Sequence, residues 1–294
     1  MKSKVAVIGA GGNIGIYVAR GLMRDYDVIP VFHCYVSAGL TGEFLDITDS
    51  NAVREFIKAK KPEIVVNLAA IADPDVCEKN PALAEKVNVD GAHNLAQACD
   101  EAGAYFIHYS TDLVFDGKKG MYTEDDIVNP LNVYAKTKAR SEKAVLAVTK
   151  NAAVLRTAIV FGKGAGKRKN FFEHVVACAR EGRSQKLFID QYRSFFYVGD
   201  SSLAVKALIE NRSTGLYHLG GAHRGRYEFT LDILKRMGLP TGMMEGVKMD
   251  DVASHALRPK DCSLDSSRFK RETGFAVTPF PEAVQKFKVS LGFV

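Results

Sequence analysis

Short apolar runs alternate with segments of helical periodicity through the first half of the chain. The apolar runs predict buried strands, which cover residues 4–10, 27–32, 43–47, 63–70, 105–111 and 152–161. The segments between them predict helices over residues 13–24, 49–60, 81–102 and 130–150. Strands that alternate with helices indicate a parallel sheet with helices on both faces. We therefore predict a doubly wound α/β fold.

The second half of the chain is less regular. A glycine-rich break at residues 162–166 follows the last strand of the alternating series. Beyond it the pattern predicts helices and strands in a looser order, over 170–180, 186–190, 200–210, 216–220 and 227–237. We expect a sheet-forming domain over residues 1–161. Residues 162–294 should form mainly a smaller lobe, with some segments that return to the sheet.

The composition is that of an ordinary globular protein and excludes several classes. Of the 294 residues, 47% are hydrophobic and 25% are charged, which argues against disorder. The best apolar stretch, residues 64–72, is too short to span a membrane, and a signal peptide is not expected. The five cysteines are scattered without a CxxC pair, which predicts reduced thiols and a cytoplasmic protein. The histidines show no metal-ligand spacing.

The formal net charge of +6 is modest, and the charges are mixed along the chain. The main basic cluster consists of Lys163, Lys167, Arg168 and Lys169 among glycines. A cluster of this size is typical of a solvated loop. It has no interleaved aromatic residues, so nucleic acid is not an expected partner.

Three glycines stand between the first predicted strand and the first predicted helix. Gly9, Gly12 and Gly15 have the spacing GxxGxxG. Glycine at these positions permits a tight turn and lets the backbone approach a pyrophosphate, while the helix N-terminus supplies unpaired N–H groups. The placement between strand and helix makes the motif a strong indication of a dinucleotide site.

The end of the second predicted strand bears on the choice of dinucleotide. An acidic residue there would bind the 2′-hydroxyl of NAD, but residues 31–35 contain no acid. The stretch also lacks an arginine for the 2′-phosphate of NADP. Because no carboxylate would repel that phosphate, the sequence slightly favours NADP(H) over NAD(H).

A hydroxyl, a phenol and an amine form the candidate catalytic set. Thr111 ends a predicted strand, and parallel sheets hold their active sites at that end. Tyr134 and Lys138 are four residues apart on a predicted helix and share one face. A lysine ammonium lowers the pKa of a neighbouring phenol, so Tyr134 could exchange a proton with a carbonyl or alcohol oxygen while hydride moves at the adjacent carbon. We expect Thr111 to hydrogen-bond the same oxygen.

These motifs resemble the extended short-chain dehydrogenase/reductase superfamily, and within it the dTDP-4-dehydrorhamnose reductases. Residues 110–117, STDLVFDG, are similar to the STDYVFDG segment of those reductases, and residues 134–142 resemble their YGKTKxxxE helix. Residues 155–162 and 258–265 are similar to their LRTxxVYG and RPxxSxLD segments. The resemblance covers nearly the whole chain. It implies a Rossmann-type NAD(P)-binding domain over residues 1–161 and a substrate-binding lobe built mainly from residues 162–294.

The resemblance also assigns site residues. It implies that Thr111, Tyr134 and Lys138 are catalytic, and we place Asp112 on the substrate side of the site. It further implies that the cofactor is held by the glycine loop, the neighbouring strand ends and two of the catalytic residues, namely Gly9, Gly12, Asn13, Ile14, Gly15, Asp46, Ile47, Ala69, Ala70, Asn88, Tyr134 and Lys138.

One stretch departs from the reductase pattern. Arg193 lies seven residues before Asp200, where those reductases usually carry a GSPTY-type stretch. This arrangement resembles the RDYxHVxD stretch of nucleotide-sugar epimerases. In that group this arginine and the arginine of an RPxD segment contact the substrate diphosphate, so Arg193 and Arg258 are expected to form a diphosphate clamp. The alternative is that both are ordinary surface or ion-paired arginines.

The resemblance implies NAD(P)H-dependent reduction of the 4-keto group of a nucleotide-linked deoxysugar. A nucleotide-sugar epimerase is one alternative, favoured by Arg193, whereas Leu113 replaces the glutamate that related dehydratases use. Another alternative is a non-catalytic NADP-binding regulatory subunit like the beta subunit of methionine adenosyltransferase, although the Tyr–Lys pair is intact. The expected partners are a nucleotide-diphosphate sugar and, by resemblance, a second copy in a homodimer. A net charge of +6 suits two polyanionic ligands.

Overall fold

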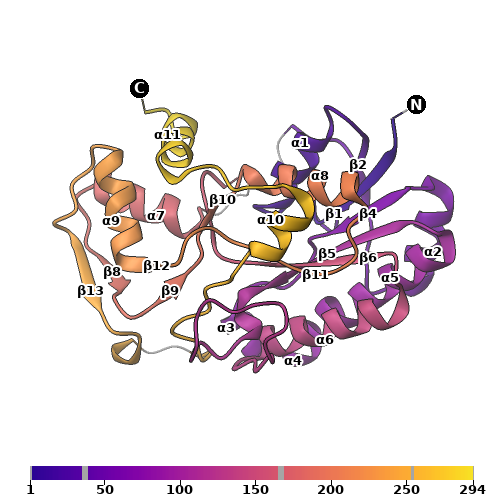
Figure 1. Cartoon of the computed structure of the whole chain (residues 1–294), viewed down its shortest axis with the longest axis horizontal. Coiled ribbons are helices and arrows are strands. Elements are labelled where there is room, and N and C mark those ends of the chain that lie inside the picture. Colours follow the sequence, from indigo (N-terminus) through magenta and orange to yellow (C-terminus); the bar gives the residue numbers. More distant parts are fainter. Residues whose placement is uncertain (1, 35–38, 165–168, 253–254, 294) are drawn as a thin grey trace.

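The computed structural model describes residues 2–34, 39–164, 169–252 and 255–293. These residues form a larger part around one sheet and a smaller part around a separate apolar cluster (Figure 1). In the view of Figure 1, the sheet and its helices lie on the right, and α7, α9 and α11 lie on the left. Lys167 and Arg168 of the basic cluster, and Tyr35, lie outside the described residues.

The larger part is built on a parallel sheet of seven strands, in the order β11-β6-β5-β4-β1-β2-β3. The strands are β1 (Lys4–Ile8), β2 (Asp27–Phe32), β3 (Glu43–Phe44), β4 (Ile64–Asn67), β5 (Tyr105–Thr111), β6 (Ala152–Thr157) and β11 (Gly215–Leu219). The strand order reverses between β1 and β4, and such a switch point opens a crevice at the carboxyl ends of the strands. The predicted doubly wound, Rossmann-type fold is confirmed.

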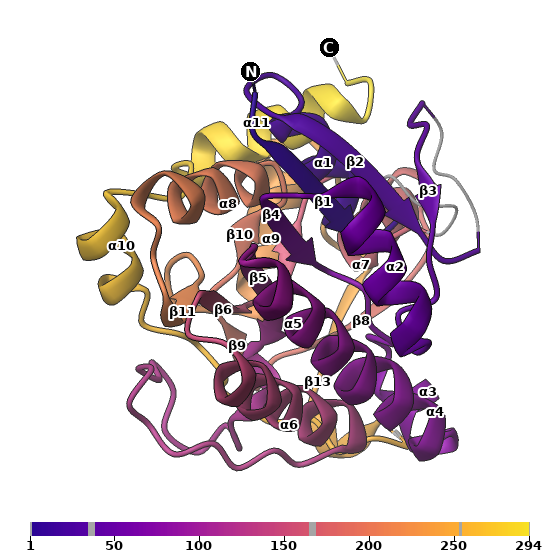
Figure 2. The same cartoon turned by 90° about the vertical axis from the view of Figure 1, so that its right-hand side faces the viewer.

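Helices cover both faces of this sheet. One face carries α1 (Gly15–Leu22), α8 (Asp200–Asn211) and α10 (Ser267–Thr273), and the other carries α2 (Ser50–Lys60), α5 (Gly91–Ala102) and α6 (Val133–Val148). Strand residues alternate between the two layers, since Val5 and Val7 pack with α1 and α8 whereas Ala6 and Ile8 pack with α2 and α5. Figure 2 shows α5 and α6 side by side on their face.

The helix ends follow local signals in the sequence. Asp49 caps α2 by accepting hydrogen bonds from the first-turn N–H groups of Asn51 and Ala52. Gly103 ends α5 in the left-handed conformation, with φ of 68°. The helix predicted over residues 81–102 is interrupted, because a π-helical turn (Lys86–Asp90) separates α4 (Pro81–Glu85) from α5.

The smaller part forms around an aromatic cluster that the second half of the chain supplies. Its helices are α7 (Phe171–Arg180), α9 (Arg226–Arg236) and α11 (Phe280–Ser290), and β8 (Gln185–Phe188) pairs in parallel with β13 (Met244–Val247). Phe172, Phe229 and Phe287 are fully buried in its core. Among the described residues, no helix is both long and apolar enough to cross a membrane.

Short elements lie between the two parts. Strand β9 (Tyr192–Arg193) pairs antiparallel with β12 (Arg224–Gly225), and β7 (Val160–Phe161) pairs in parallel with β10 (Phe196–Tyr197). Helix α3 (Pro74–Lys79) follows the loop after β4. Two 3₁₀ turns complete the described elements, Asp112–Val114 directly after β5 and Met249–Asp251 after β13.

Candidate active site

The glycine loop joins β1 to α1 in a conformation that needs glycine. Gly9 has φ of +81°, and a Cβ atom there would lie 2.8 Å from the backbone nitrogen of Ala69. A Cβ atom at Gly15 would collide with the carbonyl oxygen of Gly9. No side chain caps the N-terminus of α1; the N–H of Ile16 donates to the carbonyl oxygen of Gly12, and the positive end of the helix dipole faces the loop. The loop therefore has the shape and the donors that a pyrophosphate requires.

A cavity of about 400 Å³ lies along this loop. Its walls contain half of the predicted cofactor residues, together with the end of β2 and the loop after β4. They include Gly9, Gly12, Phe32, His33, Asp46, Ile47, Ala69, Ala70 and Ile71. Hydrogen bonds from the backbone and hydroxyl of Thr48 lower the pKa of Asp46, so this wall carries a negative charge. The cavity is large enough for part of a dinucleotide, and its residues fit the adenosine half.

Asn88 does not line this cavity. It is 1% exposed, its Oδ1 accepts a hydrogen bond from the backbone of Ile71 at 2.8 Å, and its Nδ2 donates to the Ile71 carbonyl at 3.1 Å. Nδ2 also donates to Oγ1 of Thr137 at 3.0 Å. The structure gives Asn88 a supporting role, in which it holds the lining residue Ile71 against α6. Its contact with the cofactor stays a prediction.

The structure brings Thr111 and Tyr134 together. Thr111 ends β5, and its Oγ1 accepts a hydrogen bond from the backbone N–H of Leu113 at 3.2 Å. Asn132 caps α6 two residues before Tyr134, which fixes the first turn of that helix. The Thr111 hydroxyl lies close enough to the Tyr134 phenol to lower its pKa, and the two residues are 7% and 9% exposed. A hydroxyl and a phenol thus converge on one point at the carboxyl end of the sheet.

Burial raises the pKa of Tyr134 well above its ordinary value, and this effect outweighs the lowering by the Thr111 hydrogen bond. The sequence predicted a lowering by Lys138, but that amine is not among the groups that shift the Tyr134 pKa. The phenol therefore holds its proton at neutral pH. This is the form in which it can donate a proton to a carbonyl oxygen.

Lys138 is buried against a histidine that the sequence did not single out. Its Nζ lies 3.2 Å from Nε2 of His108, and Nδ1 of the same ring lies 3.2 Å from Nδ2 of Asn67. Oδ1 of Asn67 accepts a hydrogen bond from the backbone N–H of Ala69, which fixes the orientation of the Asn67 amide. Nδ2 of Asn67 therefore donates to Nδ1 of His108, and the imidazole proton lies on Nε2, which faces both Lys138 and the Ser141 hydroxyl, 3.0 Å away.

This arrangement disfavours the charged form of Lys138. Burial lowers the pKa of Lys138 to about 8, against the opposing charge of Glu142. Burial also lowers the pKa of His108 well below its ordinary value, so the ring is neutral. A neutral imidazole N–H can donate to a neutral amine but not to an ammonium. The active site thus holds an amine that titrates near physiological pH.

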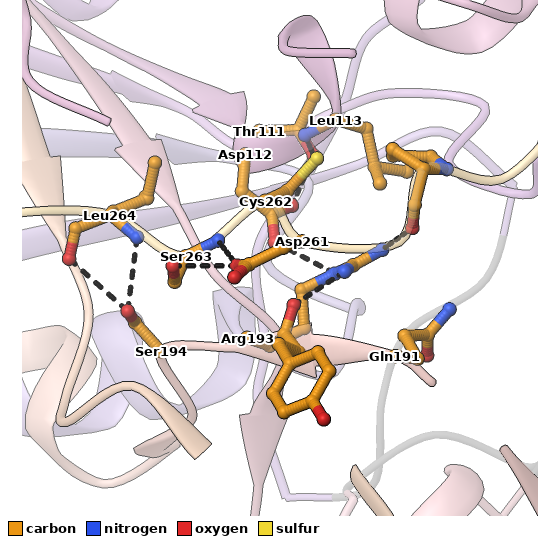
Figure 3. Close-up of polar contacts among 12 residues, drawn as sticks. Thr111, Asp112, Leu113, Gln191, Arg193, Ser194, Asp261, Cys262, Ser263 and Leu264 are labelled. Atoms are coloured by element: carbon orange, nitrogen blue, oxygen red, sulfur yellow. Dashed lines mark hydrogen bonds and ion pairs between the residues drawn. The ribbon is translucent and has the colours of Figure 1, made fainter. Parts of the chain in front are cut away.

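Arg193 does not face an open substrate site. It is 1% exposed, and its Nε lies 3.3 Å from Oδ2 of Asp112. Its Nη1 and Nη2 donate to the carbonyl oxygens of Tyr192, Lys260 and Pro259, as Figure 3 shows in part. The geometry does not support the predicted diphosphate-binding role, because these internal partners occupy the guanidinium. Arg193 instead joins β9 to the end of β5 and to the segment before Cys262.

Asp112 is correspondingly buried, at 2% exposure. Its Oδ1 accepts a hydrogen bond from the Thr111 hydroxyl at 3.1 Å. Burial raises the Asp112 pKa to about 6, although Arg193 lowers it. The structure thus gives Asp112 a part in orienting Thr111, whereas the sequence placed it among the residues on the substrate side of the site.

Arg258, the other arginine of the predicted clamp, lies on the C-terminal segment that crosses the site. Its Nη2 lies 2.7 Å from Oδ2 of Asp75 on α3, and this pair is partly exposed. Hydrogen bonding with Arg258 lowers the pKa of Asp75, so the carboxylate is charged. Of the two predicted clamp residues, only Arg258 is accessible to a ligand.

A doubly wound sheet, a glycine cradle and a Thr–Tyr–Lys set at the sheet's carboxyl end define the class of this protein, an extended short-chain dehydrogenase/reductase. Comparison with known families identifies the particular branch. A family model described as the RmlD substrate binding domain matches residues 3–291. The chain belongs to this family.

Individual relatives agree with that placement. The chain is 32% identical to the spore coat polysaccharide biosynthesis protein SpsK of Bacillus subtilis, over 97% of this chain and 96% of the relative. It is 33% identical to methionine adenosyltransferase 2 subunit beta of Bos taurus, over 81% of this chain and 73% of that protein. The structure of a dTDP-4-dehydrorhamnose reductase from Bacillus anthracis in complex with NADP is similar, with a TM-score of 0.89, 27% identity and coverage of 99% and 100%. The predicted resemblance is confirmed.

Proposed function

We propose that this protein is a nicotinamide-dependent reductase that acts on the keto group of a nucleotide-diphosphate sugar. The observation that carries the proposal is the contact between a protonated Tyr134 and Thr111, beside a glycine cradle that fits a dinucleotide. Family membership supports it, because the RmlD-type relatives of known structure include dTDP-4-dehydrorhamnose reductases.

Each residue has a role that follows from its position. The bound nicotinamide would supply hydride to the carbonyl carbon. Thr111 orients the carbonyl oxygen by a hydrogen bond, and Tyr134 donates a proton to that oxygen as negative charge develops on it. We assign to Lys138, one helical turn after Tyr134, the stabilisation of the resulting phenolate, and its pKa of about 8 lets it gain and lose a proton readily at neutral pH. Asp112 holds Thr111 in place.

We further propose that the cofactor is NADP(H). His33 and Cys34, which follow β2, line the cavity beside the glycine loop. Among the described residues that line this cavity, Asp46 is the only one with a carboxylate. The guanidinium of Arg20 on α1 reaches the region of Gly39, in the connection between β2 and β3. A cation near this connection suits the 2′-phosphate of NADP. Initial rates with NADPH and NADH at equal concentration test the preference.

The central experiment measures NADPH oxidation with a dTDP-4-keto-6-deoxysugar. The wild-type protein should consume NADPH, and Tyr134→Phe should lower kcat by about 10²- to 10⁴-fold, the usual contribution of general acid catalysis. NADPH affinity should stay nearly unchanged in this variant. Thr111→Val should also lower kcat. A Tyr134→Phe variant with wild-type turnover would remove the phenol from the mechanism.

A non-catalytic regulatory role is the second candidate, because the methionine adenosyltransferase beta subunits are 33% identical to this chain. The intact Thr111–Tyr134–Lys138 set favours catalysis. Absence of turnover with any nucleotide keto-sugar, together with a gain in the activity of a methionine adenosyltransferase mixed with this protein, would favour the regulatory role.

A nucleotide-sugar epimerase is a further alternative. It would retain tightly bound NAD through purification, which absorbance at 260 and 340 nm would detect.

We also propose a homodimer and a cytoplasmic location. The homodimer rests on resemblance to the superfamily, and sedimentation equilibrium of the purified chain tests it. The location is supported by the cysteines, all five of which are free, four of them buried.

A further inference from the structure

Arg226 is the first residue of α9 and directly follows β12. Strand β12 pairs with β9, so the backbone N–H of Arg226 donates to the carbonyl oxygen of Gln191 at 2.8 Å. Its side chain returns to the same residue, because Nη1 donates to Oε1 of Gln191 at 2.6 Å. The guanidinium carbon lies 3.7 Å from the centre of the Phe171 ring. These contacts hold the guanidinium in one position.

Arg226 differs from the neighbouring arginines in having no carboxylate partner among the described residues. Arg193 is paired with Asp112, Arg258 with Asp75 and Arg224 with Asp232. The Arg226 guanidinium has one hydrogen-bond acceptor in the described chain, the neutral amide of Gln191. A partly buried cation without a counterion is costly unless a ligand supplies the charge.

The position of Arg226 connects it to the catalytic centre. Thr111 contacts Asp112, Asp112 pairs with Arg193, and Gln191 lies directly before β9, the strand that contains Arg193. Arg193 also binds the carbonyl oxygens of Pro259 and Lys260, which immediately follow Arg258. Arg226 and Arg258 thus lie on segments on either side of β9. The Asp112–Arg193 ion pair connects this strand to Thr111.

We propose that Arg226 binds the diphosphate of the nucleotide-sugar substrate, with Arg258 beside it, in place of the pairing of Arg193 and Arg258 that the sequence predicted. This inference rests on the proposed function and assigns its anion subsite. The planar guanidinium is fixed by Gln191 and Phe171, and its remaining N–H groups are free to donate to phosphate oxygens. In a nucleotide-sugar whose keto group lies at Tyr134, the diphosphate would lie away from the reacting carbon. Arg226 likewise lies away from Thr111, beyond Asp112 and Arg193.

The electrostatics agree with this geometry. Burial, followed by the positive charges of Arg193 and Arg258, lowers the pKa of Arg226 to about 9. The local potential is therefore positive, which attracts an anion. A bound diphosphate would neutralise this excess and favour the charged guanidinium.

The experiment measures binding of thymidine 5′-diphosphate to the full chain by calorimetry, without cofactor or turnover. Arg226→Gln should weaken this binding at least about tenfold, in the range expected when a charge-assisted contact is lost. Arg226→Lys should retain part of the affinity, because it keeps the charge. The matched control is Arg236→Gln on the same helix, whose arginine is already paired with Asp232, and it should bind as the wild type does. NADPH affinity should not change in any variant.

The outcomes separate the two proposals. If the wild type reduces a keto-sugar but Arg226→Gln binds thymidine diphosphate normally, the anion subsite is wrong and the reductase proposal stands. If the wild type binds thymidine diphosphate through Arg226 but turns over no keto-sugar, the subsite stands and the reductase proposal fails. Failure of the wild type to bind the diphosphate overturns the subsite. Equal losses in the Gln and Lys variants, with a lower melting temperature in both, would also overturn it.

Discussion

Lys138 shows how one residue serves the reaction at a cost in stability. Its pKa is about 8 in the folded protein, against about 10.4 in an unfolded chain. At pH 7 the buried cation therefore destabilises the fold, and we expect Lys138→Met to raise the free energy of unfolding by roughly 1–3 kcal/mol while abolishing turnover. Urea denaturation measures the change, and Lys136→Met, at an exposed position on the same helix, is the control.

The same shift sets the sign of a pH effect on stability. Between about pH 8 and pH 10 the unfolded chain binds more protons at this position than the folded chain, so the wild type should gain stability relative to Lys138→Met as the pH rises. A constant difference between the two proteins across this range would contradict the low pKa.

The pH dependence of catalysis tests the histidine behind Lys138. Turnover should fall as the pH rises through about 8, because the Lys138 cation that stabilises the Tyr134 phenolate is lost. We expect His108→Asn, which removes the imidazole N–H that faces both Lys138 and the Ser141 hydroxyl, to move the basic limb of the kcat profile to higher pH. An unchanged limb with unchanged stability would show that His108 is only a packing residue.

At this scale the sequence indicated the proximity of Thr111 and Tyr134 but not the surroundings of the candidate catalytic set. Thr111 ends a strand and Tyr134 begins a helix, and both signals are visible in the sequence. His108 sits inside an apolar strand and carries no local signal. Arg226 resembles any other surface arginine until strand pairing places it beside Gln191. Long-range contacts decide the roles of both residues.

The end of β5 and strand β9 are joined by the buried Asp112–Arg193 pair. Arg193→Met should destabilise the fold by about 3–5 kcal/mol, because it leaves a buried carboxylate without its partner. The loss should be smaller at pH 5 than at pH 8, since a protonated Asp112 no longer buries a charge. Urea denaturation at the two pH values measures this. Adding Asp112→Asn to Arg193→Met should restore part of the stability. If Arg193→Met instead changed only the substrate KM, the predicted role of Arg193 in a diphosphate clamp would be supported.

The longer elements were predictable and the shorter ones were not. The spans predicted for β2, β5 and α2 agree with the structure within a residue, because a β-branched run or a capping aspartate marks them. Strands β9, β10 and β12 contain two residues each and are too short to show a period. These short strands pair segments distant in sequence, and the pairing of β9 with β12 brings the proposed substrate residue Arg226 to Gln191. The substrate site was therefore harder to predict than the cofactor site.

The two halves of the chain are interleaved in the whole molecule. Strand β11 and helix α8 come from the second half but complete the sheet and its helical layer, where Ala204 and Val205 share a core with Ile16 and Val18. A fragment of residues 1–161 should therefore not fold cooperatively, whereas a fragment of residues 1–219 should recover the far-UV and near-UV circular dichroism of the sheet domain to a larger extent. Cooperative unfolding of the shorter fragment would contradict this expectation.

The position of β11 also matters while the protein is being made. A ribosome releases about 5–20 residues each second, starting at the N-terminus. β6 is complete at Thr157, but its outer neighbour begins only at Gly215. For several seconds the nascent chain therefore presents an unpaired strand edge and an uncovered face of α1, both of which favour pairing with other chains. Slower translation of residues 158–214 would lengthen that interval, so the yield of native protein should depend on codon choice in this stretch more than on codon choice elsewhere.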